Sequence, residues 1–228
     1  MEKIRIKELV DFRRKSDKTR KKAFAQKLKT RTAKEKKEED PGGGNYWIIS
    51  SSSILKVFKT DDPDYYDSKI DEVSQKLNDT EIKQTKSMYQ RNIDILTAFK
   101  DFDFSDLKPV ANLKYEKIAR DSTVMTVKGF PLYVNPDALF SYNINGKDEI
   151  GALWLIQQQN SFSKSELGMF CEILYRFLVN NYGANFQISE KFCVVIDTCG
   201  AQRITYSEML SEGSIFLIDK TLEEIQTL

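Results

Sequence analysis

Apolar residues recur with helical spacing between Asp64 and Lys100. Positions three and four apart on a helix share one face, so such a stripe predicts an amphipathic helix packed on a core. Two stripes occur here: Ile70, Val73 and Leu77, then Tyr89, Ile93, Leu96 and Phe99. The pattern therefore predicts two helices with a break near Asn78-Asp79.

Strand patterns replace the helical spacing after residue 121. Val, Thr and Tyr are enriched in Ser122–Lys128 and Phe130–Asn135, which predicts two strands. Asn145-Gly146 is a strong turn signal, and it predicts a hairpin between Ala138–Ile144 and Glu149–Ile156. We therefore expect antiparallel strands in this region.

A long helix and a buried strand are predicted after the hairpin. Ser163 and Glu166 have the spacing of a capping box, and an apolar stripe runs from there to Gly183. Phe192–Asp197 is almost wholly apolar, as in strands that are covered on both faces. A crossover through a helix implies that this strand is parallel to the one before the helix. Two shorter helices are predicted at Leu113–Ala119 and Ile215–Gln226.

Together these elements predict an α/β fold with a mixed central sheet. The sheet would contain an antiparallel three-strand meander and a further buried strand, joined by a crossover helix and flanked by helices. Residues 1–40 are predicted to form a basic helical N-terminal arm, and residues 41–44, Pro-Gly-Gly-Gly, a linker. Residues 45–228 would form a single α/β domain, with a helical elaboration at 64–120 and the sheet-bearing core at 121–228.

Charge is distributed unevenly along the chain, although the formal net charge is only +1. Residues 1–37 contain 16 Lys and Arg against 5 Asp and Glu, a net charge of +11, and residues 41–228 contain 19 against 26, a net charge of −7. Such asymmetry predicts a basic segment attached to a mildly acidic domain. Six cations of the basic segment are candidate contacts to the phosphates of nucleic acid: Arg13, Arg14, Lys15, Arg20, Lys21 and Lys22.

The chain contains no histidine, which excludes Ser-His-Asp hydrolysis and zinc sites that use histidine. Chemistry would have to use carboxylates, lysines, tyrosines or a bound divalent ion. Cys171 and Cys193 fall in a predicted apolar helix and a predicted buried strand, so we expect both to be reduced core residues. No signal peptide and no apolar run of about 18 residues is present, so we expect a cytoplasmic protein that does not span a membrane.

The order of the predicted elements, together with Pro136-Asp137 and Glu149, resembles the restriction-endonuclease-like, or PD-(D/E)XK, nuclease superfamily. The resemblance covers roughly residues 113–197. In such enzymes two acids hold Mg²⁺, and a lysine two residues after the second acid helps to activate water. The resemblance implies that Asp137 and Glu149 are catalytic and metal-binding, and that Glu116 is a third metal ligand.

The motif is degenerate, because Gly151 stands where the family has its lysine. Each acid also has a structural alternative. Asp137 could form a turn at the start of a strand, and Glu149 could belong to a solvated hairpin. Glu116 could pair with Arg120 on the surface of a helix.

Three functions remain open from the sequence. The first is a nucleic-acid-associated protein on a nuclease-like fold with an eroded cleavage site. The second is an active Mg²⁺-dependent DNA or RNA endonuclease with a relocated lysine, such as Lys128, Lys147 or Lys164. The third is a protein-interaction subunit whose basic arm, residues 1–40, docks on an acidic partner.

Overall fold

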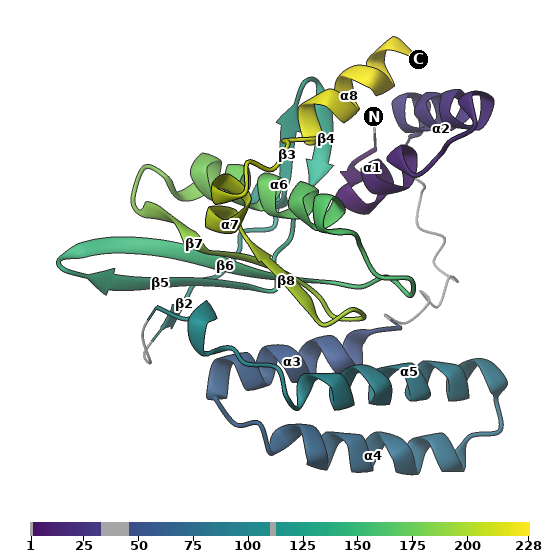
Figure 1. The fold of residues 1–228 in the computed structure, drawn as a ribbon, viewed down its shortest axis with the longest axis vertical. Helices are drawn as coiled ribbons and strands as arrows, with labels where there is room; N and C mark the ends of the chain where they lie inside the picture. The colour runs from purple at the N-terminus through teal and green to yellow at the C-terminus, as the bar shows by residue number, and fades with distance from the viewer. Residues whose placement is uncertain (1, 33–45, 110–112) are drawn as a thin grey trace.

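The computed structural model describes residues 2–32, 46–109 and 113–228 of the chain. A five-stranded sheet lies at its centre, in the order β2-β5-β6-β7-β8 (Figure 1). Neighbouring strands are antiparallel except β6 and β7, which are parallel. The predicted α/β class and mixed central sheet are therefore confirmed. The strands are β2 (Lys114–Tyr115), β5 (Ala138–Ile144), β6 (Lys147–Ile156), β7 (Gln187–Asp197) and β8 (Gln202–Thr205).

The turn and the helix start that the sequence predicts at the centre of the fold both occur. Asn145 and Gly146 have φ angles of 53° and 79°, the positive values that a tight hairpin turn requires, and they join β5 to β6. The crossover helix α6 (Lys164–Tyr182) begins after Ser163, whose backbone N–H donates to Glu166 Oε2 at 2.8 Å. The helix ends at Gly183 and returns the chain to β7, parallel to β6.

Helices cover both faces of the central sheet. One face, which presents residues such as Phe140 and Leu153, is covered by α3 (Ile48–Thr60) and α5 (Lys83–Phe99), and α4 (Tyr65–Asp79) packs on these two helices. Leu139 and Ala152, the neighbours of those two residues, point to the other face and pack against α6. Figure 1 shows α3–α5 below the sheet and α6 above it. The two predicted helices between Asp64 and Lys100 are thus α4 and α5.

A second, smaller sheet has the order β1-β4-β3. It consists of β1 (Ile4–Arg5), β4 (Phe130–Tyr133) and β3 (Val124–Val127), with β1 parallel and β3 antiparallel to β4. The strands predicted within residues 122–135 therefore exist, but they belong to this sheet and not to the central one. The helix predicted within residues 113–119 is wrong, because the edge strand β2 occupies that place.

The N-terminal segment is part of the core. Helices α1 (Ile6–Arg13) and α2 (Lys18–Thr30) pack near α8 (Ile218–Thr227), and α7 (Tyr206–Ser211) lies beside β7. Ile6, Leu9 and Phe12 are 1% exposed or less and join the cluster that includes the inner face of α6. The prediction of a separate basic arm is therefore wrong for residues 2–32. The predicted linker, residues 41–44, lies outside the described residues.

A buried acid joins α6 to the start of α8. Glu172 Oε2 accepts hydrogen bonds from the backbone N–H groups of Leu217, at 2.9 Å, and Ile218, at 3.2 Å. Its other oxygen accepts from Arg176, which also pairs with Asp219 at 2.8 Å. Burial raises the pKa of Glu172, whereas these partners lower it. The acid thus satisfies helix-terminal N–H groups that would otherwise be buried without partners.

Cys171 and Cys193 are buried free thiols, as predicted, and Cys199 is half-buried. In the part of the chain that the structure describes, no helix has both the length and the apolar character that crossing a bilayer demands.

Candidate functional site

The acids of the predicted metal site lie far apart. In the β5–β6 hairpin Ala138 pairs with Leu153 and Tyr142 pairs with Glu149, so Glu149 lies five positions along β5 from Asp137. Five residues of strand span about 17 Å. Oxygen ligands to Mg²⁺ or Ca²⁺ lie about 2.0–2.6 Å from the ion. The prediction that Asp137 and Glu149 share one ion is therefore wrong.

Glu116, the third predicted metal ligand, directly follows the edge strand β2. Its Oε1 accepts a hydrogen bond from Ser141 Oγ at 2.7 Å and lies 2.9 Å from the Lys114 ammonium. Lys114 first, and then Ser141, lower the pKa of Glu116. Within residues 2–32, 46–109 and 113–228, no three Cys, Asp or Glu side chains are grouped so that they could hold a metal ion. These residues do not fit the Mg²⁺ site that the resemblance implies.

The Asp137 side chain has a structural role just before the start of β5. Its backbone N–H donates to Leu153 O at 2.9 Å, and its Oδ2 accepts from the backbone N–H of Leu155 at 2.7 Å. The side chain thus continues the hydrogen-bond ladder in place of a backbone carbonyl. Burial raises the pKa of Asp137 to about 6, although the Leu155 hydrogen bond and the charge of Lys59 act in the opposite direction.

Gly151 stands where the resemblance would require a lysine, and the surrounding atoms leave no room for a side chain there. A Cβ atom at this position would lie 2.6 Å from the carbonyl oxygen of Phe192 and 2.8 Å from Cε2 of Phe140. The pairing of β6 with β7 also shifts register here, between Ile150 and Ala152. No side chain fits at position 151 without displacing backbone. Glu149 accepts a hydrogen bond from the Tyr142 hydroxyl at 2.7 Å.

Two of the six cations that were predicted to contact phosphates form ion pairs within the protein instead. Arg14 forms a two-pronged ion pair with Glu166, with N–O distances of 2.6 and 2.7 Å, and also donates to Ser161 O. Lys21 pairs with Glu224 on α8 at 2.6 Å. These two cations fasten the N-terminal helices to the rest of the fold.

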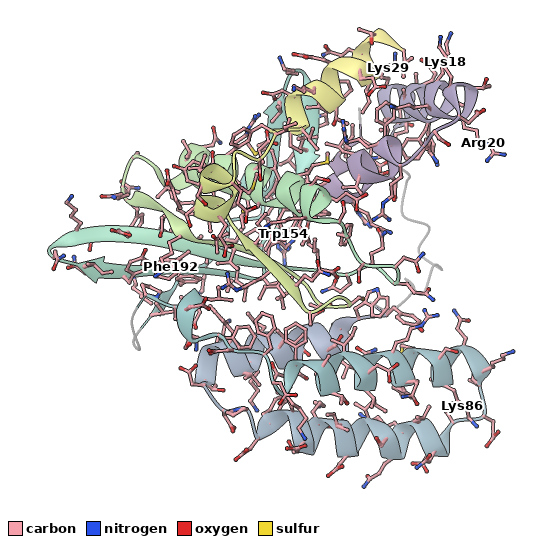
Figure 2. The ribbon with its side chains drawn as sticks, in the orientation of Figure 1. Lys18, Arg20, Lys29, Lys86, Trp154 and Phe192 are labelled. Atoms are coloured by element: carbon pink, nitrogen blue, oxygen red, sulfur yellow. The ribbon has the colours of Figure 1, made fainter. Side chains whose placement is uncertain are left out.

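The other four predicted cations are more accessible. Arg13 is exposed and donates to the Thr221 hydroxyl at 3.3 Å, and the Lys15 ammonium lies 4.8 Å from the ring centroid of Phe24. Arg20 and Lys22 are exposed on α2 and form no ion pair with any described residue. Figure 2 shows Lys18 and Arg20 on the outer side of this helix. Part of the predicted basic surface is therefore present on α2.

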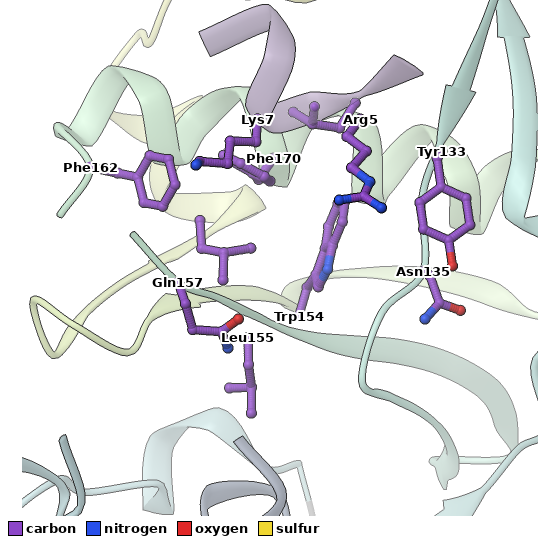
Figure 3. A pocket seen from close by; sticks show the side chains of 11 residues that line it. Arg5, Lys7, Tyr133, Asn135, Trp154, Leu155, Gln157, Phe162 and Phe170 are labelled. Atoms are coloured by element: carbon purple, nitrogen blue, oxygen red, sulfur yellow. The ribbon is translucent and has the colours of Figure 1, made fainter. Parts of the chain in front are cut away.

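A cleft of about 340 Å³ opens where β6 ends (Figure 3). It lies between the last residues of β6, the end of β4, and the segment in which β1 passes into α1. In open α/β sheets ligands commonly bind beyond the carboxyl ends of strands. Its polar lining consists of Arg5, Lys7, Asn135 and Gln157, and its aromatic lining of Tyr133, Trp154, Phe162 and Phe170.

A strip of cations borders this cleft. Lys3, Arg5 and Lys7 are exposed, whereas Ile4 and Ile6 between them are buried, so the cations all project outward. Among the described residues none of these three cations forms an ion pair. Figure 3 shows the Arg5 side chain reaching between Trp154 and Tyr133. We call Lys3, Arg5 and Lys7 the cation strip.

Arg31 forms ion pairs with two acids that lie beside the cation strip, Glu8 and Glu2. Its guanidinium forms a two-pronged ion pair with Glu8, one N–O distance being 2.7 Å, and lies 3.6 Å from Glu2. Arg31 also donates to Lys3 O at 2.8 Å. Hydrogen bonds from Arg31 and from the Arg5 backbone lower the pKa of Glu8, although burial opposes them. Arg31 offsets one of the two negative charges, and Lys3, Arg5 and Lys7 outnumber the one that is left, so the surface keeps a positive charge.

Buried Asp197, the last residue of β7, holds the loop that closes the cleft. Its Oδ2 accepts from the backbone N–H of Phe162 at 2.9 Å, and its Oδ1 accepts from that of Cys199 at 3.0 Å. Phe162 packs edge-on against Phe170, with ring centroids 5.2 Å apart. Asp197 therefore has a positioning role for one wall of the cleft.

Neither Trp154 nor the cation strip was predicted from the sequence as part of a site. Trp154 does pack in the core, because it meets Phe170 edge-on, but its half-buried ring also lines the cleft. The signal for the strip is the alternation Lys3-Ile4-Arg5-Ile6-Lys7, which has the period of a strand with one buried face.

No protein-family model, curated protein or solved structure matches this chain. The resemblance to PD-(D/E)XK nucleases therefore stays a prediction.

Proposed function

We propose that this protein binds nucleic acid at the cleft beside the cation strip, and that it does not cut the strand with Asp137 and Glu149. The observation that carries this proposal is a group of three cations that form no ion pair with any described residue, next to a cleft with aromatic walls. The proposal keeps the nucleic-acid association expected from the sequence and moves its site to other residues.

The cleft combines the two kinds of contact that nucleic acids use. Lysine and arginine attract phosphates, and the release of condensed counterions makes this attraction strong and dependent on salt. Aromatic rings bind the faces of bases with little dependence on sequence. Lys7 and Arg5 provide the first contact, and Trp154 and Tyr133 provide the second.

The exposed cations of α2 add a second, weaker support. Lys18, Arg20 and Lys22 lie on a helix whose buried residues, Ala25 and Leu28, face the core. A cluster of like charges raises the local concentration of an oppositely charged polymer and speeds its association. The cations of α2 would thus attract the nucleic acid, and the cleft would bind it.

The positions of the acids argue against cleavage by the predicted route. About 17 Å of strand between Asp137 and Glu149 prevents a shared ion. Gly151 cannot be replaced by the missing lysine without a steric clash. We therefore expect an oligonucleotide to remain intact when it is incubated with the protein and Mg²⁺ or Mn²⁺.

Fluorescence anisotropy with a labelled 12-nucleotide oligonucleotide, offered as a single strand and as a duplex, tests the proposal. The double variant Arg5→Ala/Lys7→Ala should weaken binding and lower the slope of log K against log salt by about 1.4, at about 0.7 per phosphate of a single strand. The matched control is Lys83→Ala/Lys86→Ala at the start of α5, far from the cleft in Figure 2. It should leave affinity and slope unchanged.

Two results would contradict the proposal. If neither form of the oligonucleotide binds, the proposal is refuted. If both double variants weaken binding equally, the attraction is a property of overall charge and not of the cleft.

A further inference from the structure

The aromatic rings of the cleft are recessed in its walls. Trp154 is half-buried, and its ring meets that of Phe170 edge-on, with centroids 5.5 Å apart and planes at 79°. Tyr133 stands on the neighbouring strand β4, and Figure 3 shows the Arg5 side chain between these two aromatic residues. A ligand must enter the cleft to reach either ring.

This geometry distinguishes between paired and unpaired bases. Bases inside a duplex present only their edges in the grooves, because their faces are stacked on one another. An unpaired base can leave the stack and lay its face on an aromatic side chain. A cleft of about 340 Å³ lies in the size range of pockets for small ligands. A double helix is too wide to enter it, whereas one base is not.

The cation strip provides a path for the backbone of such a strand. Lys3 directly precedes β1 and Arg5 ends it, so their Cα atoms are separated by about 6.6 Å if the segment is extended. The Lys3 ammonium lies 3.8 Å from the ring centroid of Tyr133, which places positive charge directly beside the aromatic wall. Phosphates along β1 would therefore lie next to a base that turns inward.

Gln157 offers a polar contact at the floor of the cleft. Its amide nitrogen donates to Ser51 Oγ at 2.9 Å, which fixes the orientation of the amide. The carbonyl oxygen of this amide faces Trp154 in Figure 3. An acceptor at this place can receive a hydrogen bond from the edge of a base.

We infer that the cleft takes an unpaired base of single-stranded nucleic acid, with the flanking phosphates on the cation strip. This inference rests on the proposed function and adds the class of ligand. The base stacks on Trp154, or on Tyr133 in place of the Lys3 ammonium that lies over that ring, and a base-paired strand is bound only through its phosphates.

A Trp47→Phe variant tests the inference, because it leaves Trp154 as the single tryptophan of the chain. Its fluorescence is followed during titration with a 12-nucleotide single strand, and with a blunt duplex of the same length at the same salt concentration. We expect the single strand to quench Trp154 and to bind at least about tenfold more tightly than the duplex.

A Trp154→Leu substitution should then weaken single-strand binding between about 5-fold and 100-fold, and should change duplex binding by less than about twofold. Thermal melting checks that the variant is folded. Tyr133→Leu, at a half-buried position of β4, serves as the second variant if Trp154→Leu does not fold.

Equal or tighter binding of the duplex would overturn the inference while leaving the proposed function in place. Single-strand binding that does not alter Trp154 fluorescence in the Trp47→Phe variant would overturn it as well. If neither form binds, the proposed function itself fails.

Discussion

Asp137 should destabilise the folded protein when it is ionised. Burial raises its pKa from 3.8 to about 6, so the folded state keeps a proton that the unfolded chain loses at lower pH. The free energy of unfolding must therefore fall as pH rises from about 3.8 to about 6, and this contribution is constant above that range. Asp137→Asn removes the ionisation and keeps an oxygen that can accept from the N–H of Leu155.

The size of the effect follows from the shift in pKa. A difference of about two units corresponds to about 3 kcal/mol at pH 8, at 1.36 kcal/mol per unit. At pH 4.5 the same linkage gives about 1 kcal/mol, because the unfolded carboxyl is then only partly ionised. The stability of Asp137→Asn relative to the natural sequence should thus increase by about 2 kcal/mol between pH 4.5 and pH 8.

Urea unfolding followed by circular dichroism, at both pH values, measures this difference. Any constant cost of exchanging an oxygen for an amide nitrogen cancels in the comparison. A stability difference that does not depend on pH would refute the reasoning. A variant that becomes less stable relative to the natural sequence as pH rises would show instead that the Asp137 charge is stabilising, as a close partner of Lys59 would be.

Three further substitutions test other parts of the structure. Glu166→Gln should act in the opposite direction to Asp137→Asn: Arg14 lowers the pKa of Glu166, so urea unfolding should show about 1 kcal/mol lost at pH 8 and less at low pH. Gly151→Lys should cost about 1–3 kcal/mol or more in the same assay, because its Cβ meets backbone, and it should not create cleavage of DNA. Glu172→Gln should cost about 1–3 kcal/mol and should speed amide hydrogen exchange within α8, since the carboxylate accepts from the start of that helix.

Features that depend on neighbouring residues were predictable from the sequence. The capping box at Ser163 and Glu166 and the turn at Asn145-Gly146 need only local chemistry, and both occur as expected. The buried strand that ends at Asp197 was predictable for a similar reason, because a run of apolar residues of that length fits a strand covered on both faces.

The N-terminal segment was misjudged because burial there depends on distant partners. Its apolar residues are few and stand among many charges, a pattern that is typical of a solvated helix. The structure satisfies several of those charges across the fold, as in the pairs Arg14–Glu166 and Lys21–Glu224. A single sequence does not show which acid, more than a hundred positions away, neutralises a given cation.

The predicted pair of acids failed for a reason that the sequence already contained. A two-residue turn at Asn145-Gly146 fixes the register of the hairpin, and counting back from it places Glu149 opposite Tyr142. Asp137 lies five positions further along β5. The cleft, in contrast, was not predictable, because its walls come from the N-terminus, β4 and β6, which are distant in sequence.

Photocrosslinking shows directly whether single-stranded nucleic acid binds in the cleft, because it identifies the peptides that the bound nucleic acid contacts. A 12-nucleotide single strand with a photoreactive base is bound, irradiated and digested, and the attached peptides are identified by mass spectrometry. We expect the oligonucleotide to be attached to the peptides that carry Trp154 or Tyr133. Attachment confined to α2 or to the α4–α5 hairpin, with none at the cleft, would contradict it.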